Sequence, residues 1–365
     1  MHFIIDAHED LATNMMTFQR DYRRSVSETR SLEAGTQIPS LNEDTLIGWP
    51  EYQRGQVALV CATLFAAPKQ YQLGGWDKTV YENAAEARVI FRQQMALYNT
   101  LCEMNPDMFR MITTRRDLQE LLGQWEEKPA AYPDCTHPVG ILPLMEGAEG
   151  LDDPGEIKDW WEAGVRIVGP VWAGTRYCGG TKQPGRFTPE GRELLAHMAK
   201  SGFILDISHM SPESALEALD IYTGAVIASH GNALSMVKGA SSPRHFTDET
   251  LTKLVARDGV VGVVPYNRFL VNGWTPTQPR SDVPLELVVN QIDHICQLTG
   301  SSQHVGIGSD FDGGFGLQSV PLEIDTIADL QKIDGMLSQR GYPNTDIAAI
   351  LGLNWKRFLE SALPE

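Results

Sequence analysis

The segment FIIDAHED, residues 3–10, begins as an apolar strand and ends in charged side chains. His8 and Asp10 are two positions apart, so on an extended strand both side chains point to the same side. Short runs rich in valine and isoleucine recur after this segment, separated by stretches with helical spacing of apolar residues. The runs start near Phe3, Val57, Val139, Val165, Phe203, Ala225, Val260 and His304. This alternation predicts an α/β fold, a parallel (β/α)8 barrel of the TIM type.

The length and composition favour one folded unit. The chain has 365 residues, 42% hydrophobic and 21% charged, which is ordinary for a globular enzyme. Barrels routinely use this much sequence as one domain, so we expect residues 1–365 to form a single barrel domain. Two long segments, Arg20 to Pro50 and Pro265 to Pro284, follow predicted strands and would lie over the C-terminal face as lids or specificity loops. Surface excursions without ligand contact are the alternative.

The charge of the chain restricts its partners. The formal net charge is -17, which would repel a nucleic acid or an anionic membrane. We therefore expect a small-molecule or peptide substrate, with no nucleic-acid or membrane partner. The five cysteines form no CxxC pair and are interpreted as reduced thiols. With neither a leader-like region before the first strand nor an apolar run of spanning length, a cytoplasmic location is expected.

Residues that can bind metals stand at the ends of further predicted strands, where barrels of this type place their active sites. Glu146 follows an apolar run, and a carboxylate buried there needs a metal, a cation or a dense set of hydrogen bonds. A salt bridge to Arg166 is the alternative. His209 and His230 each close an apolar strand with the same Ser-His pair. Two imidazoles on adjacent strands can converge on one metal.

The last predicted strand continues into VGIGSDFDGG, residues 305–314, which places Asp310 at the strand end. We expect Asp310 to be the catalytic acid and base, because that role needs a carboxylate near the metals rather than bound to both. Asp312 fits a loop-capping aspartate, since it precedes two glycines. The expected centre holds two divalent ions, with zinc as the expected metal, that activate a water for attack on a carbonyl. Its expected ligands are His8, Asp10, bridging Glu146, His209 and His230.

As a set, the motifs resemble those of the membrane (renal) dipeptidase family of the amidohydrolase superfamily. The matching motifs are DAHEDL (6–11), MEGAEGL (145–151), GVRIV (164–168), LDISHMS (205–211), AVIASH (225–230), SSPRHFTDE (241–249) and VGIGSDFDG (305–313), with GLNWKRFLE (352–360) as a softer match. They run over nearly the whole chain. The resemblance implies a barrel with a dinuclear zinc site on the ligands named above, hydrolysis of dipeptides, Asp310 as the acid and base, and a homodimer.

Two further positions follow from the resemblance. Arg244 matches the arginine with which the family holds the terminal carboxylate of its substrate, a task that suits a guanidinium fork. A structural ion pair with Asp248 or Glu249 is the alternative. Trp172 stands at or beside the position of a substrate-binding histidine of the family, so we expect it to contact the substrate.

The departure at Trp172 leaves the substrate open. Either Trp172, Arg176 or Tyr177 takes over the role of the missing imidazole, or the pocket accepts a bulkier or differently charged amide. The sequence is therefore also consistent with an amidohydrolase that acts on a non-peptide amide, a lactone or an amino-acid conjugate. A non-catalytic binding relative is a third hypothesis, which the retention of Asp310 and every expected ligand argues against.

Overall fold

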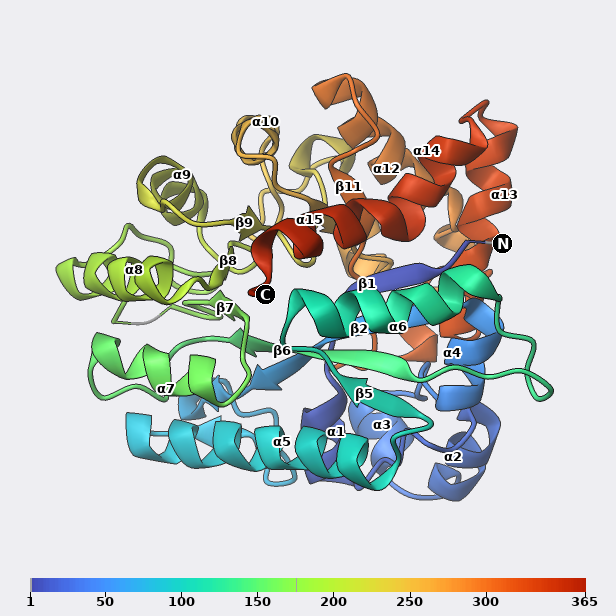
Figure 1. The fold of residues 1–365 in the computed structure, drawn as a ribbon, viewed down its shortest axis with the longest axis horizontal. Coiled ribbons are helices and arrows are strands. Elements are labelled where there is room, and N and C mark those ends of the chain that lie inside the picture. The colour runs from blue at the N-terminus through green and yellow to red at the C-terminus, as the bar shows by residue number, and fades with distance from the viewer. Residues whose placement is uncertain (1, 175) are drawn as a thin grey trace.

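The computed structural model describes residues 2–174 and 176–365. Its central sheet is a nearly closed barrel of parallel strands (Figure 1). In pairing order they are β10 (Val261–Val263), β11 (Val305–Ile307), β1 (Ile4–Glu9), β2 (Val57–Phe65), β6 (Val139–Glu146), β7 (Ile167–Gly169), β8 (Ile204–Asp206) and β9 (Val226–Ile227). A bridge between Ala228 and Val261 joins the two ends of this order. The predicted (β/α)8 barrel is confirmed, and each predicted strand corresponds to one of these eight.

Helices surround the strands (Figure 1). Their buried apolar residues form one hydrophobic core with those of the strands. They include α1 (Leu11–Phe18), α5 (Ala84–Met104), α6 (Arg115–Glu127), α7 (Ile157–Glu162), α8 (Pro189–Ser201), α9 (Pro212–Ile221), α10 (Asp248–Ala256), α12 (Glu286–Thr299), α13 (Lys332–Gln339), α14 (Asn344–Ala348) and α15 (Asn354–Ala362). Side-chain caps start several of them, as where the Ser211 hydroxyl accepts a hydrogen bond from the Ser214 amide. Among the described helices, none has both the length and the apolar character needed to cross a bilayer.

One strand beside the barrel was not predicted. β5 (Phe109–Met111) pairs with the first half of β6, while β7 pairs with its last residues. Both neighbours therefore use the same edge of β6. A three-residue strand between two long helices carries too short a pattern to be recognised, because a period of two needs more positions to stand out. A further pair of two-residue strands, β3 (Ala67–Pro68) and β4 (Val80–Tyr81), lies outside the barrel.

The two long segments are partly helical and are attached near the carboxyl ends of the strands. The first contains α2 (Val26–Glu33), α3 (Ile38–Asn42) and the start of α4 (Trp49–Gly55). It is fixed to the loop after β11 by hydrogen bonds to Asp312. The second contains α11 (Asn267–Leu270), whose Phe269 ring lies 5.1 Å from the Arg244 guanidinium carbon. Both therefore lie over the C-terminal face of the barrel, as predicted.

Candidate metal centre

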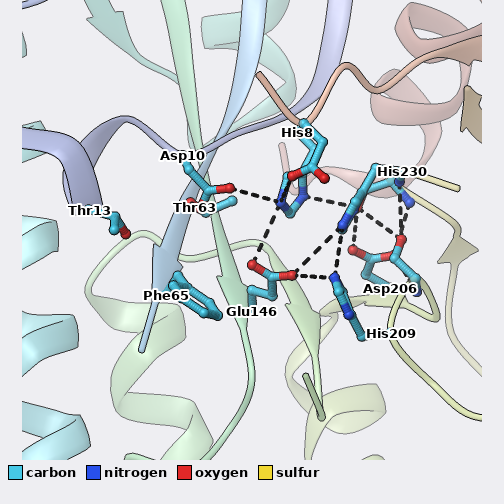
Figure 2. Close-up of polar contacts among 12 residues, drawn as sticks. His8, Asp10, Thr13, Thr63, Phe65, Glu146, Asp206, His209 and His230 are labelled. Carbon is cyan, nitrogen blue, oxygen red and sulfur yellow. Dashed lines mark hydrogen bonds and ion pairs between the residues drawn. The ribbon is translucent and has the colours of Figure 1, made fainter. Parts of the chain in front are cut away.

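The side chains expected to bind metal converge at the carboxyl ends of the barrel strands (Figure 2). His8 lies in β1 and Glu146 is the last residue of β6. His209 follows β8, and His230 follows β9. Because parallel strands end at the same face, residues distant in sequence meet here. The expected set is therefore brought together completely.

Glu146 stands between two groups of histidines (Figure 2). Its Oε1 lies 2.7 Å from His209 Nε2 and 3.8 Å from His230 Nε2. Its Oε2 lies 3.7 Å from His8 Nε2, which is 3.8 Å from Asp10 Oδ2. Each carboxylate oxygen thus faces a different set of ligand atoms, as a bridging carboxylate does.

The alternative partner considered for Glu146, a salt bridge to Arg166, does not form among the described residues. Arg166 donates instead to the backbone carbonyls of Thr113 and Trp161, each at 2.7 Å. Its guanidinium also lies over the Trp161 ring, 4.1 Å from the ring centroid. Arg166 therefore holds the segment before β7 against α7 and against the residues that follow β5.

The arrangement of these atoms fits a metal ion. The Nε2 atoms of His209 and His230 face each other at 3.0 Å, and His8 Nε2 is buried without a hydrogen-bond partner among the described residues. Three overlapping groups of residues each offer three ligand atoms, one per residue, that lie within 4.8 Å of one another. The groups are His8, Asp10 and Glu146; Glu146, His209 and His230; and His8, His230 and Asp310. Buried nitrogens and carboxylates that converge in this way need a cation between them.

The protonation states follow from burial and from neighbouring charges. Burial, reinforced by nearby Arg244, lowers the pKa of His209 to about 4, and burial with His8 lowers that of His230 well below its usual value. Burial opposes the charge of Glu146, but His209 and His8 outweigh it and hold the pKa of that carboxyl below its usual range. Neutral imidazoles and an ionised carboxylate are the forms that bind metals.

His8 differs from the other two histidines. Burial lowers its pKa, but the attraction of Glu146 and Asp10 outweighs burial and raises the pKa of His8 to about 9. The carboxylates around His8 therefore require a positive charge at this position. A metal ion would supply that charge in place of the proton.

Hydrogen bonds behind the histidines fix which nitrogen faces the centre. The Ser229 hydroxyl donates to Asp206 and accepts from His230 Nδ1 at 2.8 Å. Ser229 Oγ also lies 3.3 Å from His8 Nδ1, and Thr181 Oγ1 lies 3.1 Å from His209 Nδ1. With Nδ1 occupied, each ring presents Nε2 to the centre.

Asp206 organises this network and was not predicted. Its Oδ1 accepts from the backbone amides of Ser208 at 3.0 Å and Ser229 at 2.9 Å. It thus ties the end of β8 to the end of β9. Asp206 lies beside the histidines of the centre (Figure 2). The signal for it is present in LDISH, residues 205–209, where an acid closes an apolar strand.

We expect Asp206→Asn to weaken metal binding about 10- to 100-fold, because the partners behind metal-binding histidines contribute that much to affinity. The amide can accept at only one of its two positions, so Ser229 loses its fixed orientation. Competition with a chromophoric chelator measures the change. Asp220→Asn is the control, since Asp220 forms an exposed ion pair with Lys253. Equal affinity in both variants would contradict the positioning role.

Comparison with known proteins identifies the family. Residues 1–363 match the membrane dipeptidase family, peptidase family M19. The chain belongs to this family. Dipeptidase ataJ of Aspergillus terreus is 34% identical over 296 residues, 73% of this chain and 66% of that protein. An uncharacterised protein from the pqqA 5′ region of Klebsiella pneumoniae is 29% identical over 283 residues, 74% of this chain and 96% of that protein.

Solved structures agree on the fold. The crystal structure of a metallo peptidase from Rhodobacter sphaeroides, liganded with a phosphinate mimic of the dipeptide L-Ala-D-Ala, matches with a TM-score of 0.77. The two chains are 20% identical, and 99% of each is covered. The family resemblance drawn from the motifs is thereby confirmed, and membership makes this chain a metallohydrolase of the dipeptidase type.

Asp310, the expected acid and base of this dipeptidase-family chain, lies at the rim of the centre. Its Oδ1 is 3.8 Å from His8 Nε2, and its side chain is 14% exposed, whereas that of His8 is fully buried. Burial raises the pKa of Asp310 well above its usual value. A Cβ at Gly313 would lie 2.4 Å from Asp310 Oδ1 and 2.7 Å from Asp10 Oδ2, so only glycine lets the two carboxylates sit against this turn.

Arg244, the position at which the dipeptidase family holds the substrate carboxylate, is buried beside two metal-centre histidines. It donates to the carbonyls of Ser208 at 2.9 Å and His230 at 3.1 Å. Its Nε has no hydrogen-bond partner among the described residues. Asp248, one of the two alternative partners, pairs instead with His294 at 3.0 Å.

Trp172 lies beside the centre, as its place in the dipeptidase-family pattern predicts. The centroid of its ring is 6.1 Å from the centroid of the His209 ring. The Trp172 ring also packs edge-on against the rings of Phe65 and Tyr71, with centroid distances of 5.2 Å and 5.9 Å. Arg176, in contrast, forms an ion pair with Glu190 at 3.1 Å. Of the three residues considered for the role of the missing imidazole, Trp172 is thus the one whose ring lies beside His209.

Proposed function

We propose that the chain hydrolyses the amide bond of dipeptides or closely related small amides at a centre of two divalent metal ions, with zinc as the metal. The observation that carries this proposal is the place of Glu146, whose two oxygens face separate sets of ligand atoms. The Rhodobacter sphaeroides relative, crystallised with a dipeptide mimic, supports the choice of substrate. When bound, the ions would polarise the carbonyl and activate a water.

The residues of the chain would then divide the work. His8, Asp10, Glu146, His209 and His230 would hold the ions. Asp310 would accept a proton from the attacking water and return it to the leaving amine, because its raised pKa favours the protonated form needed for the return. Arg244 would bind the terminal carboxylate of the substrate with those guanidinium N–H groups that do not donate to the carbonyls of Ser208 and His230. Trp172 would cover the centre and restrict water.

Release of amino acids from a panel of dipeptides tests the proposal. We expect metal-loaded protein to cleave members with L or D residues at the C-terminal position and chelated protein to cleave none, because the water is activated only at a metal. Reloading with zinc, manganese or cobalt after chelation identifies the metals that support turnover. No release by metal-loaded protein would contradict dipeptide hydrolysis.

A second substrate class follows from Trp172. A bulky ring beside His209 changes the shape of the site where the family has a histidine, and this favours non-peptide amides, lactones or amino-acid conjugates. The same panel should therefore include N-acyl amino acids and lactones. Turnover of these compounds without turnover of dipeptides would replace the first proposal with the second.

A further inference from the structure

Three aromatic rings gather beside the metal centre: those of Phe65, Tyr71 and Trp172, which we call the aromatic cluster. The Trp172 ring packs edge-on against the rings of Phe65 and Tyr71, with interplanar angles of 70° and 77°. All three residues are partly exposed. Aromatic side chains that lie together at the surface, instead of in the core, are typical of ligand-binding sites.

The aromatic cluster is continuous with the residues expected to bind metal. Phe65 is the last residue of β2 and pairs in register with Glu146, the last residue of β6. Paired residues of parallel strands direct their side chains to the same side of the sheet, so Phe65 and Glu146 lie side by side (Figure 2). The Trp172 ring lies 6.1 Å from the His209 ring, measured between centroids. A substrate bound at the metal centre therefore borders on the cluster.

Hydrogen bonds hold the aromatic cluster in place. The side chain of Gln94, which is fully buried, accepts from the Phe65 amide and donates to the Phe65 carbonyl, each at 2.8 Å. Gln183 donates to the Tyr71 hydroxyl at 3.3 Å and so links the loop after β2 to the loop after β7. A surface that is ordered before binding loses little conformational freedom when a ligand arrives. The cluster is therefore a preformed apolar surface.

The position of Arg244 decides which end of a dipeptide meets the aromatic cluster. Arg244 donates to the carbonyls of Ser208 and His230, so it lies at the ends of β8 and β9. Phe65 lies at the end of β2, which β6 and β7 separate from β8 in the barrel. The scissile carbonyl of a dipeptide lies between its two residues. With that carbonyl at the metals and the C-terminal carboxylate on Arg244, the N-terminal residue extends toward the ends of β2 and β6.

We propose that the aromatic cluster binds the side chain of the N-terminal residue and selects dipeptides in which this side chain is large and apolar, as in phenylalanine or leucine. The inference rests on the proposed dipeptidase function and adds a substrate class to it. Burial of a large apolar side chain, in place of a methyl group, should favour the substrate by about 10- to 100-fold.

Comparison of Phe-Ala with Ala-Ala tests the inference, because the two dipeptides differ only in the N-terminal side chain and share the leaving group. We expect kcat/KM to be about 10- to 100-fold higher for Phe-Ala. Trp172→His and Tyr71→Ala should each lower this ratio by about 2- to 10-fold, since each removes one large ring from the cluster. Tyr132→Ala is the control, because Tyr132 is 37% exposed, packs on Trp49 and lies before the start of β6. It should keep the wild-type ratio.

Binding without turnover provides a second readout. Calorimetry with phosphinate mimics of Phe-Ala and Ala-Ala should show the same ratio in Kd and the same decrease in the two cluster variants. Tighter binding of the phenylalanyl mimic without cleavage of either dipeptide would support the cluster while contradicting dipeptide hydrolysis.

Three results would overturn the inference. Equal kcat/KM for Phe-Ala and Ala-Ala in the wild-type protein is the first, and cleavage of both would then leave the proposed function standing. An equal gain for Ala-Phe over Ala-Ala is the second, because the cluster would then not be reserved for the N-terminal residue. A wild-type ratio in both Trp172→His and Tyr71→Ala is the third, because the preference would then arise elsewhere.

Discussion

Asp310→Asn should lower kcat by about 10²- to 10⁴-fold, which is the usual contribution of a positioned acid or base. Asparagine keeps the shape of the side chain but can neither accept the proton of the attacking water nor return it to the leaving amine. Asp310 lies 3.8 Å from His8 Nε2 at the rim of the centre, so it is close enough to act without being central to the ligand set. Steady-state kinetics on the dipeptide cleaved best by the wild-type protein measures the loss.

Metal content separates this role from metal binding. We expect Asp310→Asn to keep its ions, with KM changed much less than kcat, because Glu146 and the three histidines remain. Asp10→Asn is the informative comparison, since Asp10 is expected to be a ligand and its loss should lower metal content. Loss of metal from Asp310→Asn would make Asp310 a ligand instead of the acid and base.

Much of the fold, and the convergence of the expected ligands at one face, could be predicted because both depend on local features of the sequence. Each barrel strand is an apolar run, and each expected ligand stands at the end of such a run. Parallel strands that end at one face bring these residues together without further information. The family motifs add Arg244 and Trp172, and the structure places Arg244 against the backbone of the loops that carry His209 and His230, and the Trp172 ring beside His209.

The features that escaped prediction depend on contacts between distant segments. Asp206 orients His230 only because Ser229 stands between them in space. β5 is too short to have a pattern of its own. The spacing of hydrophobic residues and the positions of strand ends do not reveal contacts between distant segments or strands of three residues.

Asp312 illustrates how two neighbouring aspartates acquire different roles. Asp310 and Asp312 both have a φ of +60°, yet Asp312 is fully buried, whereas the side chain of Asp310 is 14% exposed. Its carboxylate accepts hydrogen bonds from Arg20 Nη1 at 3.0 Å, the Thr45 hydroxyl at 2.7 Å and the Leu46 amide at 3.0 Å. The side chain of Asp312 therefore anchors the long segment between α1 and β2, instead of capping the turn that it begins.

Asp312→Ala is therefore expected to lower the free energy of unfolding by about 3–5 kcal/mol, the usual effect of removing one partner of a buried ion pair. Arg20 would keep Glu33, 2.9 Å from its Nε, but would lose the carboxylate that ties it to the loop after β11. Urea denaturation followed by tryptophan fluorescence measures the change. Asp325→Ala is the matched control, because Asp325 pairs with Arg30 at 3.0 Å while its side chain is 69% exposed, and an exposed pair contributes only about 0–1 kcal/mol. Equal stability of the two variants would contradict the structural role of Asp312, whereas a large loss in Asp312→Ala beside unchanged stability in Asp310→Asn would separate the anchoring aspartate from the catalytic one.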